Sequence, residues 1–163
     1  MQSTSARGFT FVELMLVLII MGIGVAIAVP RFNGLIQNYK LTNAARVVWL
    51  DLHRARMRAI KERRTMRIDF TATSYTTYRV RVSPETQDTP VFSRNLSDAY
   101  SGTTFDPDYL ASVSFGSTGT ANSKTVVIQQ SSTRRKNFTI SSTGRIRQIC
   151  PGLQAPNAVG ICS

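Results

Sequence analysis

The first part of the chain is a nearly continuous apolar segment. Hydrophobic residues fill almost every position from Phe9 to Val29, whereas the remainder mixes apolar and polar residues as soluble domains do. As a helix, these 21 residues would span about 31 Å, close to the thickness of the hydrocarbon core of a bilayer. We therefore predict a transmembrane helix over residues 9–29 that carries a soluble head.

The pattern becomes amphipathic after Pro30. Apolar residues then recur at helical spacing on one face: Leu41, Ala44, Ala45, Val48, Leu52, Ala55 and Ala59. This spacing predicts a second helical stretch over residues 30–64, with its apolar stripe packed on a sheet. Arg56 and Arg63 lie near the edge of the stripe, and we expect them to extend to solvent or to pair with an acid. Gly22, Gly24 and Pro30 weaken helices, so we also predict a kink or a melted stretch between them.

Alternating hydrophobicity predicts strands in the rest of the chain. The predicted strands are Met66–Phe70, Tyr78–Val82, Val91–Leu96, Ser112–Phe115, Thr125–Gln129 and Asn137–Ile140. One long N-terminal helix followed by strands indicates an α+β fold, with the helix packed on an antiparallel β-sheet. Residues 65–163 would form this β-rich head.

Charge is distributed unevenly along the sequence. The formal net charge is +11, and no Asp or Glu follows Asp108. The basic residues after that point are Lys124, Arg134, Arg135, Lys136, Arg145 and Arg147. A region whose charged side chains are all positive attracts a polyanion such as DNA, although basic residues can also serve only to keep a protein soluble.

The N-terminal residues have an unusual pattern for an exported protein. Residues 1–8 (MQSTSARG) are polar, and the apolar run that follows contains one acid, Glu13. An ionised carboxylate inside a membrane costs several kcal/mol unless it has a partner. The segment RGFTFVELMLVLIIMGIGVAIAVP resembles the class III signal of type IV prepilins and pseudopilins.

That resemblance implies a processing route and a location. Residues 1–8 would be a leader that prepilin peptidase removes after Gly8, with methylation of the new N-terminal Phe9. Glu13 would then face the N-terminal amine of a neighbouring pilin subunit during assembly. The chain would cross the bacterial inner membrane once, with its head in the periplasm, before it enters a pilus or pseudopilus.

Internal segments resemble the GspH/FimT group of minor pilins. They are RARMRAIKERRTMRIDF, VSFGSTGT and TGRIR. GspH-type members belong to the type II secretion pseudopilus and FimT-type members to type IV pili. Some FimT-type proteins bind DNA through a C-terminal Gly-Arg-x-Arg, which Gly144, Arg145 and Arg147 match.

The residues of this motif support the same interpretation physically. In an extended segment, Arg145 and Arg147 would point to one side and Ile146 into the protein, and two guanidinium groups facing one way can bind phosphates. Arg134, Arg135 and Lys136, predicted in the preceding turn, would extend the site. The alternative is a solvated strand edge whose basic residues prevent aggregation.

Two cysteines, Cys150 and Cys162, are the only ones in the sequence. In an exported domain they predict one disulfide that closes a C-terminal loop after the basic motif. Two free buried thiols are the alternative.

The sequence gives little support for an enzyme. The only histidine, His53, lies in the predicted helix without an evident partner for acid–base or metal chemistry, and residues 116–120 lack the lysine of a phosphate-binding loop. We expect no catalytic residues, metal, cofactor or small-molecule substrate.

The sequence therefore predicts a minor type IV pilin that binds DNA nonspecifically and supports DNA uptake in natural transformation. A minor pseudopilin of a type II secretion system, or a subunit that primes pilus assembly, is the structural alternative. A major pilin is a third.

Overall fold

The computed structural model describes residues 10–131 and 134–149. The chain divides into two units between Gln37 and Asn38. One helix, α1 (Phe11–Glu62), begins in the first unit and ends in the second.

The first unit contains the apolar half of α1. From Phe11 to Ile27 its large hydrophobic side chains are exposed, and the segment is strongly apolar. By length and composition this stretch can cross a membrane. The helix continues through Gly22, Gly24 and Pro30, so the predicted melted stretch is wrong, whereas the alternative of a kink stays a prediction. A proline removes only one backbone hydrogen bond, and the remaining apolar helix keeps its backbone groups paired internally.

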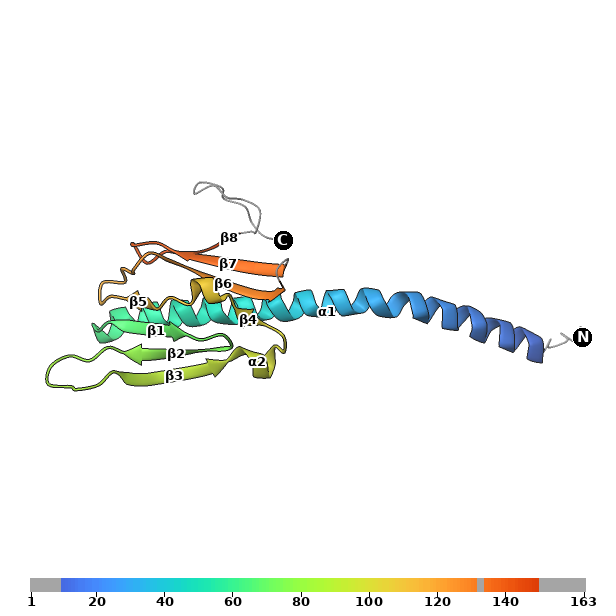
Figure 1. Ribbon diagram of the computed structural model, residues 1–163, viewed down its shortest axis with the longest axis horizontal. Helices are drawn as coiled ribbons and strands as arrows, with labels where there is room; N and C mark the ends of the chain where they lie inside the picture. Colours follow the sequence, from blue (N-terminus) through green and yellow to red (C-terminus); the bar gives the residue numbers. More distant parts are fainter. Residues whose placement is uncertain (1–9, 132–133, 150–163) are drawn as a thin grey trace, which may run out of the picture. The chain divides into compact units, whose positions relative to one another are not determined.

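The second unit contains two four-stranded antiparallel sheets (Figure 1). Sheet A has the order β3-β2-β1-β5 and sheet B the order β4-β6-β7-β8. The strands of sheet A are β1 (Met66–Phe70), β2 (Ser74–Arg79), β3 (Thr89–Asn95) and β5 (Val113–Phe115). Those of sheet B are β4 (Thr104–Phe105), β6 (Lys124–Ser131), β7 (Arg134–Ile140) and β8 (Ile146–Ile149). Two short helices, α2 (Leu96–Ala99) and η1 (Pro107–Tyr109), lie between strands.

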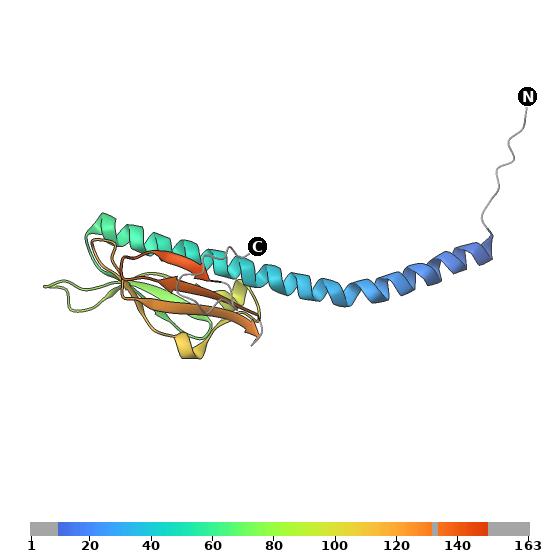
Figure 2. The ribbon, with the colours of Figure 1, turned by 90° about the horizontal axis from the view of Figure 1, so that it is seen from above.

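The hydrophobic core joins the second half of α1 to both sheets. All seven residues of the predicted apolar stripe of α1 are buried, so that prediction is confirmed. They share one core cluster with Ile68 of sheet A and with Phe138 and Ile140 of sheet B. Figure 2 shows this half of α1 lying along one side of the strands. The α+β class and the helix-on-sheet packing are thus confirmed.

The number of sheets and the position of the second strand differ from the predictions. The strands form two sheets rather than one, because alternation within a strand shows which side chains are buried but not which strands pair. The second strand lies at Ser74–Arg79 rather than Tyr78–Val82, since its register places Arg79 opposite Met66 at the start of β1. Beyond Arg79, the Val80 N–H donates instead to the Thr65 carbonyl.

Candidate nucleic-acid interface

The turn between β7 and β8 carries Arg145. The Gly144 N–H donates to the Ser141 carbonyl at 2.8 Å, and the Ser141 N–H donates to the Arg145 carbonyl at 3.0 Å. The Arg145 N–H donates in turn to Ser141 Oγ at 3.2 Å. Gly144 has a φ of 74°, a conformation that favours glycine because side chains with a Cβ rarely adopt it. The turn therefore fixes the backbone of Arg145 on both sides of its Cα.

The next residues place two arginines on either side of a buried isoleucine. Ile146 is 8% exposed and belongs to the core, whereas Arg145 and Arg147 are exposed. In the β7–β8 register, Arg147 lies opposite Thr139. Since successive side chains of an extended segment point to opposite faces, Arg145 and Arg147 point to the same face. Within the described residues neither forms an ion pair, so both guanidinium groups keep a full uncompensated charge.

The three other predicted cations lie on β7, the strand that pairs with β8. Arg134, Arg135 and Lys136 lie in β7 rather than in the predicted turn. Strand β6 pairs with them there, with Gln129 opposite Arg135 and Ile128 opposite Lys136. All three are half-buried, and strand alternation sends Arg135 to the opposite side from its two neighbours. Arg135 also forms a 3.3 Å ion pair with buried Asp106. Alternation thus divides the three residues between the two faces of β7.

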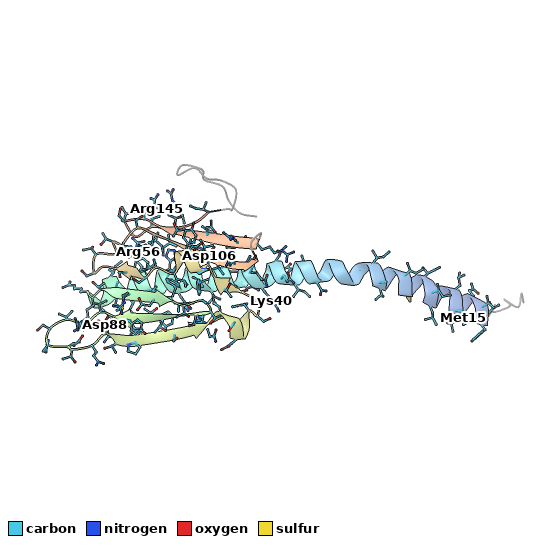
Figure 3. All side chains as sticks on the ribbon, in the orientation of Figure 1. Met15, Lys40, Arg56, Asp88, Asp106 and Arg145 are labelled. Atoms are coloured by element: carbon cyan, nitrogen blue, oxygen red, sulfur yellow. The ribbon has the colours of Figure 1, made fainter. Side chains whose placement is uncertain are left out.

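A residue of α1, Arg56, connects two turns of the head. Its Nε donates to the Gly119 carbonyl at 3.0 Å, and its Nη2 donates to the Thr143 carbonyl at 3.3 Å. Gly119 lies in the turn that follows β5, and Thr143 in the turn that carries Arg145. Figure 3 labels Arg56 and Arg145 in the same part of the head. Within the described residues Arg56 pairs with no acid, contrary to one form of the expectation, and two of its donors bond to backbone carbonyls of the two turns instead.

Both turns are closed tightly around glycines. A Cβ on Gly144 would lie 1.9 Å from the Gly119 carbonyl oxygen and 2.8 Å from Arg56 Nε. Gly119 has a φ of 81° and packs against the side chain of Ile60. Hydrogen bonds from the Gly119 N–H to the Gly116 carbonyl and from the Gly116 N–H to the Thr120 carbonyl close the turn at residues 116–120.

A buried acid in α1 was missed from the sequence. Asp51 is 1% exposed and accepts hydrogen bonds from the Tyr75 hydroxyl at 2.5 Å, from Arg94 Nε at 2.8 Å and from Arg54 Nη1 at 2.9 Å. Burial and the neighbouring Asp51 raise the pKa of the Tyr75 phenol. Burial lowers the pKa of Arg94, but the hydrogen bond and charge of Asp51, together with Tyr75, outweigh this and raise it. The available signal was that Asp51 falls three residues after Val48 on the buried face of the helix.

Other predicted site residues lie at the ends of the chain. Gly8, Phe9, Cys150 and Cys162 are outside the described residues. Glu13 is exposed on the apolar half of α1, where its N–H donates to Thr10 Oγ1 at 3.2 Å. Along residues 10–131 and 134–149, no basic side chain pairs with its carboxylate and no three His, Cys, Asp or Glu residues gather to hold a metal ion.

Two family models match the sequence. Residues 44–144 match the family described as type II transport protein GspH, and residues 3–29 match the prokaryotic N-terminal methylation motif. The first match covers more than half of the chain. The chain belongs to the GspH family. Members of this GspH-type minor pilin family assemble with other pilin subunits, and the methylation motif is the substrate of prepilin peptidase.

Solved structures support the same fold for this GspH-family chain. It is similar to the type IV minor pilin FimU of Pseudomonas aeruginosa, with 20% identity and a TM-score of 0.55 over 69% of this chain and 90% of that one. It is also similar to the minor pseudopilin EpsH from the type 2 secretion system of Vibrio cholerae, with 15% identity and a TM-score of 0.55 over 70% of this chain and 99% of that one. A search of curated protein sequences gave no significant match.

Proposed function

We propose that this GspH-family chain is a minor type IV pilin that binds DNA nonspecifically and supports its uptake. Cleavage after Gly8 and methylation of Phe9 would release a subunit anchored by residues 9–29, with the periplasmic head starting in the amphipathic half of α1. Glu13 would pair with the terminal amine of a neighbouring subunit, which supplies the partner that its carboxylate lacks within the described chain. Retraction of the pilus would then draw bound DNA toward the periplasm.

The exposed pair Arg145 and Arg147 carries this proposal. The two guanidinium groups leave the protein on one side, and within the described residues no acid neutralises either of them. Arginine matches phosphate geometry with two donors at once, and phosphate contacts hold nucleic acid without reading its sequence. No Asp or Glu follows Asp108, so the last third of the chain adds no repulsion toward a polyanion.

The test is DNA binding by the soluble head, from about residue 36 onward, as salt is varied. We expect binding that weakens steeply with salt, and Arg145→Gln with Arg147→Gln should reduce the slope by about 1.8 for duplex DNA, about 0.9 for each lost contact. The matched control removes two exposed charges elsewhere, Arg46→Gln with Arg81→Gln. If the first double variant binds no more weakly than the control, DNA does not bind at this site.

A structural role without DNA is the second candidate. The family description and the similarity to EpsH favour a minor pseudopilin of a type II secretion system, and a subunit that primes pilus assembly would share the same fold. In either case the basic surface would contact neighbouring subunits or anionic lipid headgroups. A head without DNA affinity even at low salt would favour this candidate, and neighbouring genes for secretion or for pili would separate its two forms.

A further inference from the structure

The two turns held by Arg56 behave as one unit. Besides the bonds of Arg56 to the Gly119 and Thr143 carbonyls, the Ala121 N–H donates to the Ser142 carbonyl at 3.0 Å. The contact between Gly144 and the Gly119 carbonyl leaves no room for any side chain. The turn that carries Arg145 is therefore locked to the turn after β5 and, through the guanidinium group, to α1.

These contacts among Arg56, Gly119 and the turn of Gly144, called the lock below, determine where the phosphate-binding arginines are held. Arg145 directly follows Gly144, and Arg147 follows after Ile146, which is anchored in the core. The contacts with Gly119 and Arg56 therefore restrict the backbone between Gly144 and Ile146. A preorganised pair binds more tightly than a mobile one, because the backbone ordering has been completed before the ligand arrives.

The bonding of Arg56 distinguishes it from the other arginines of α1. Arg54 and Arg58 pair with Asp51 and Glu62, whereas Arg56 is half-buried and donates only to main-chain carbonyls in its observed bonds. Lysine carries the same charge but lacks the planar fork of arginine, so it cannot hold both carbonyls in this geometry.

We propose that Arg56 is a positioning residue of the DNA site: its guanidinium group holds the turn of Arg145 in the conformation that binds phosphates. This inference rests on the proposed function of Arg145 and Arg147. Arg56 would not touch the nucleic acid, and its effect would pass entirely through those two residues.

Full-length protein in nanodiscs of zwitterionic lipid, titrated into a short fluorescein-labelled DNA duplex, tests the proposal. Arg56→Lys keeps the charge and should weaken binding by about two- to tenfold, the equivalent of one lost hydrogen bond, with an unchanged salt slope. Arg58→Lys is the matched control, since this exposed neighbour contacts Glu62 and not the turns, and its DNA affinity should equal that of the unmodified protein.

The same substitution in the Arg145→Gln/Arg147→Gln background separates positioning from direct contact. We expect Arg56→Lys to have no further effect there, because the residues that it positions are gone. Hydrogen exchange should also be faster at the Gly144 and Arg145 amides of Arg56→Lys, which tests the lock without reference to DNA.

The possible failures are distinguishable. Full DNA affinity in Arg56→Lys, beside weakened binding in Arg145→Gln/Arg147→Gln, would overturn the positioning role and leave the DNA site standing. An equal loss in both backgrounds would overturn it as well, because Arg56 would then act independently of the pair. Full affinity in Arg145→Gln/Arg147→Gln would refute the proposed function itself, and the positioning role with it.

Discussion

The hydroxyl of Tyr75 donates a 2.5 Å hydrogen bond to Asp51 Oδ2, which joins β2 of sheet A to the buried face of α1. The same oxygen accepts from Arg94 Nε of β3 at 2.8 Å. One carboxylate thus connects the helix with two neighbouring strands. Its charge is compensated by arginines whose side chains reach solvent, whereas the carboxylate itself is buried.

Asp51→Asn should destabilise the head by about 2 kcal/mol, because a buried hydrogen-bonded charge is lost while Arg94 can still hydrate. Tyr75→Phe should cost about 1 kcal/mol, since only one hydrogen bond disappears. Urea unfolding of the soluble head measures both. Asp69→Asn is the control, because its pair with Arg67 lies at the surface and should contribute less than about 1 kcal/mol. Equal losses for Asp51→Asn and Asp69→Asn would contradict the buried role of Asp51.

Gly144→Ala should destabilise the head by on the order of 3 kcal/mol, through backbone strain at positive φ and a clash with the Gly119 carbonyl. Gly102→Ala provides the comparison, because Gly102 has a φ of 83° but its nearest neighbours would lie 3.8 Å away. That change should cost about 1 kcal/mol from strain alone. Thermal unfolding of the two variants under one condition gives the difference. Matching melting temperatures would show that the two turns do not pack as closely as described.

Much of the fold follows from local patterns. The 3.6-residue period of α1 identified every buried hydrophobic residue from Leu41 to Ala59, because helix geometry alone decides which positions share a face. Period-two alternation placed β1 at its observed residues for the same reason. The short elements β4 and α2 were missed, since two to four residues carry no measurable period and depend on contacts such as the Asn95 cap.

The site was predicted only in part. Alternation around Ile146 was enough to place Arg145 and Arg147 on one side, whereas the position of Arg134, Arg135 and Lys136 in a strand depends on pairing with β6. Arg56 and its carbonyl partners are 63 and 87 positions apart in the sequence. No local signal connects residues at such distances. The lock and the buried acid are therefore products of tertiary packing.

His53 should make the head less stable in mild acid. Its ring lies 4.3 Å from that of Trp49, and burial, followed by the nearby charge of Arg56, lowers the pKa of His53 below the ordinary 6.5. At a pH between the lowered pKa of the folded head and the ordinary 6.5 of the unfolded chain, only the unfolded chain binds a proton at His53. The free energy of unfolding therefore falls as the pH drops below 6.5. Urea unfolding between about pH 7.5 and 5.5 should show this loss, and His53→Gln should remove it. A loss of the same size in His53→Gln would assign it to other groups.

Glu62, the last residue of α1, should contribute stability that is lost at lower pH. Its carboxylate accepts from Arg58 Nε at 2.6 Å and from Arg79 Nε of β2 at 2.8 Å, and chiefly the Arg58 bond lowers the pKa of Glu62 below 4.5. The contribution is therefore complete above pH 4.5 and disappears as the pH falls through the lowered pKa.

Glu62→Gln should cost less than about 1 kcal/mol at neutral pH, because its partners are partly exposed. The difference in unfolding free energy between Glu62→Gln and the unmodified head should vanish once Glu62 is protonated in both states. The bond from Arg64 also lowers the pKa of Glu85, so Glu85→Gln must be measured in parallel. The losses of unfolding free energy in the two variants should add. If the effect of Glu62→Gln stays constant into acid, the ion pairs of Glu62 do not hold the end of α1 to β2.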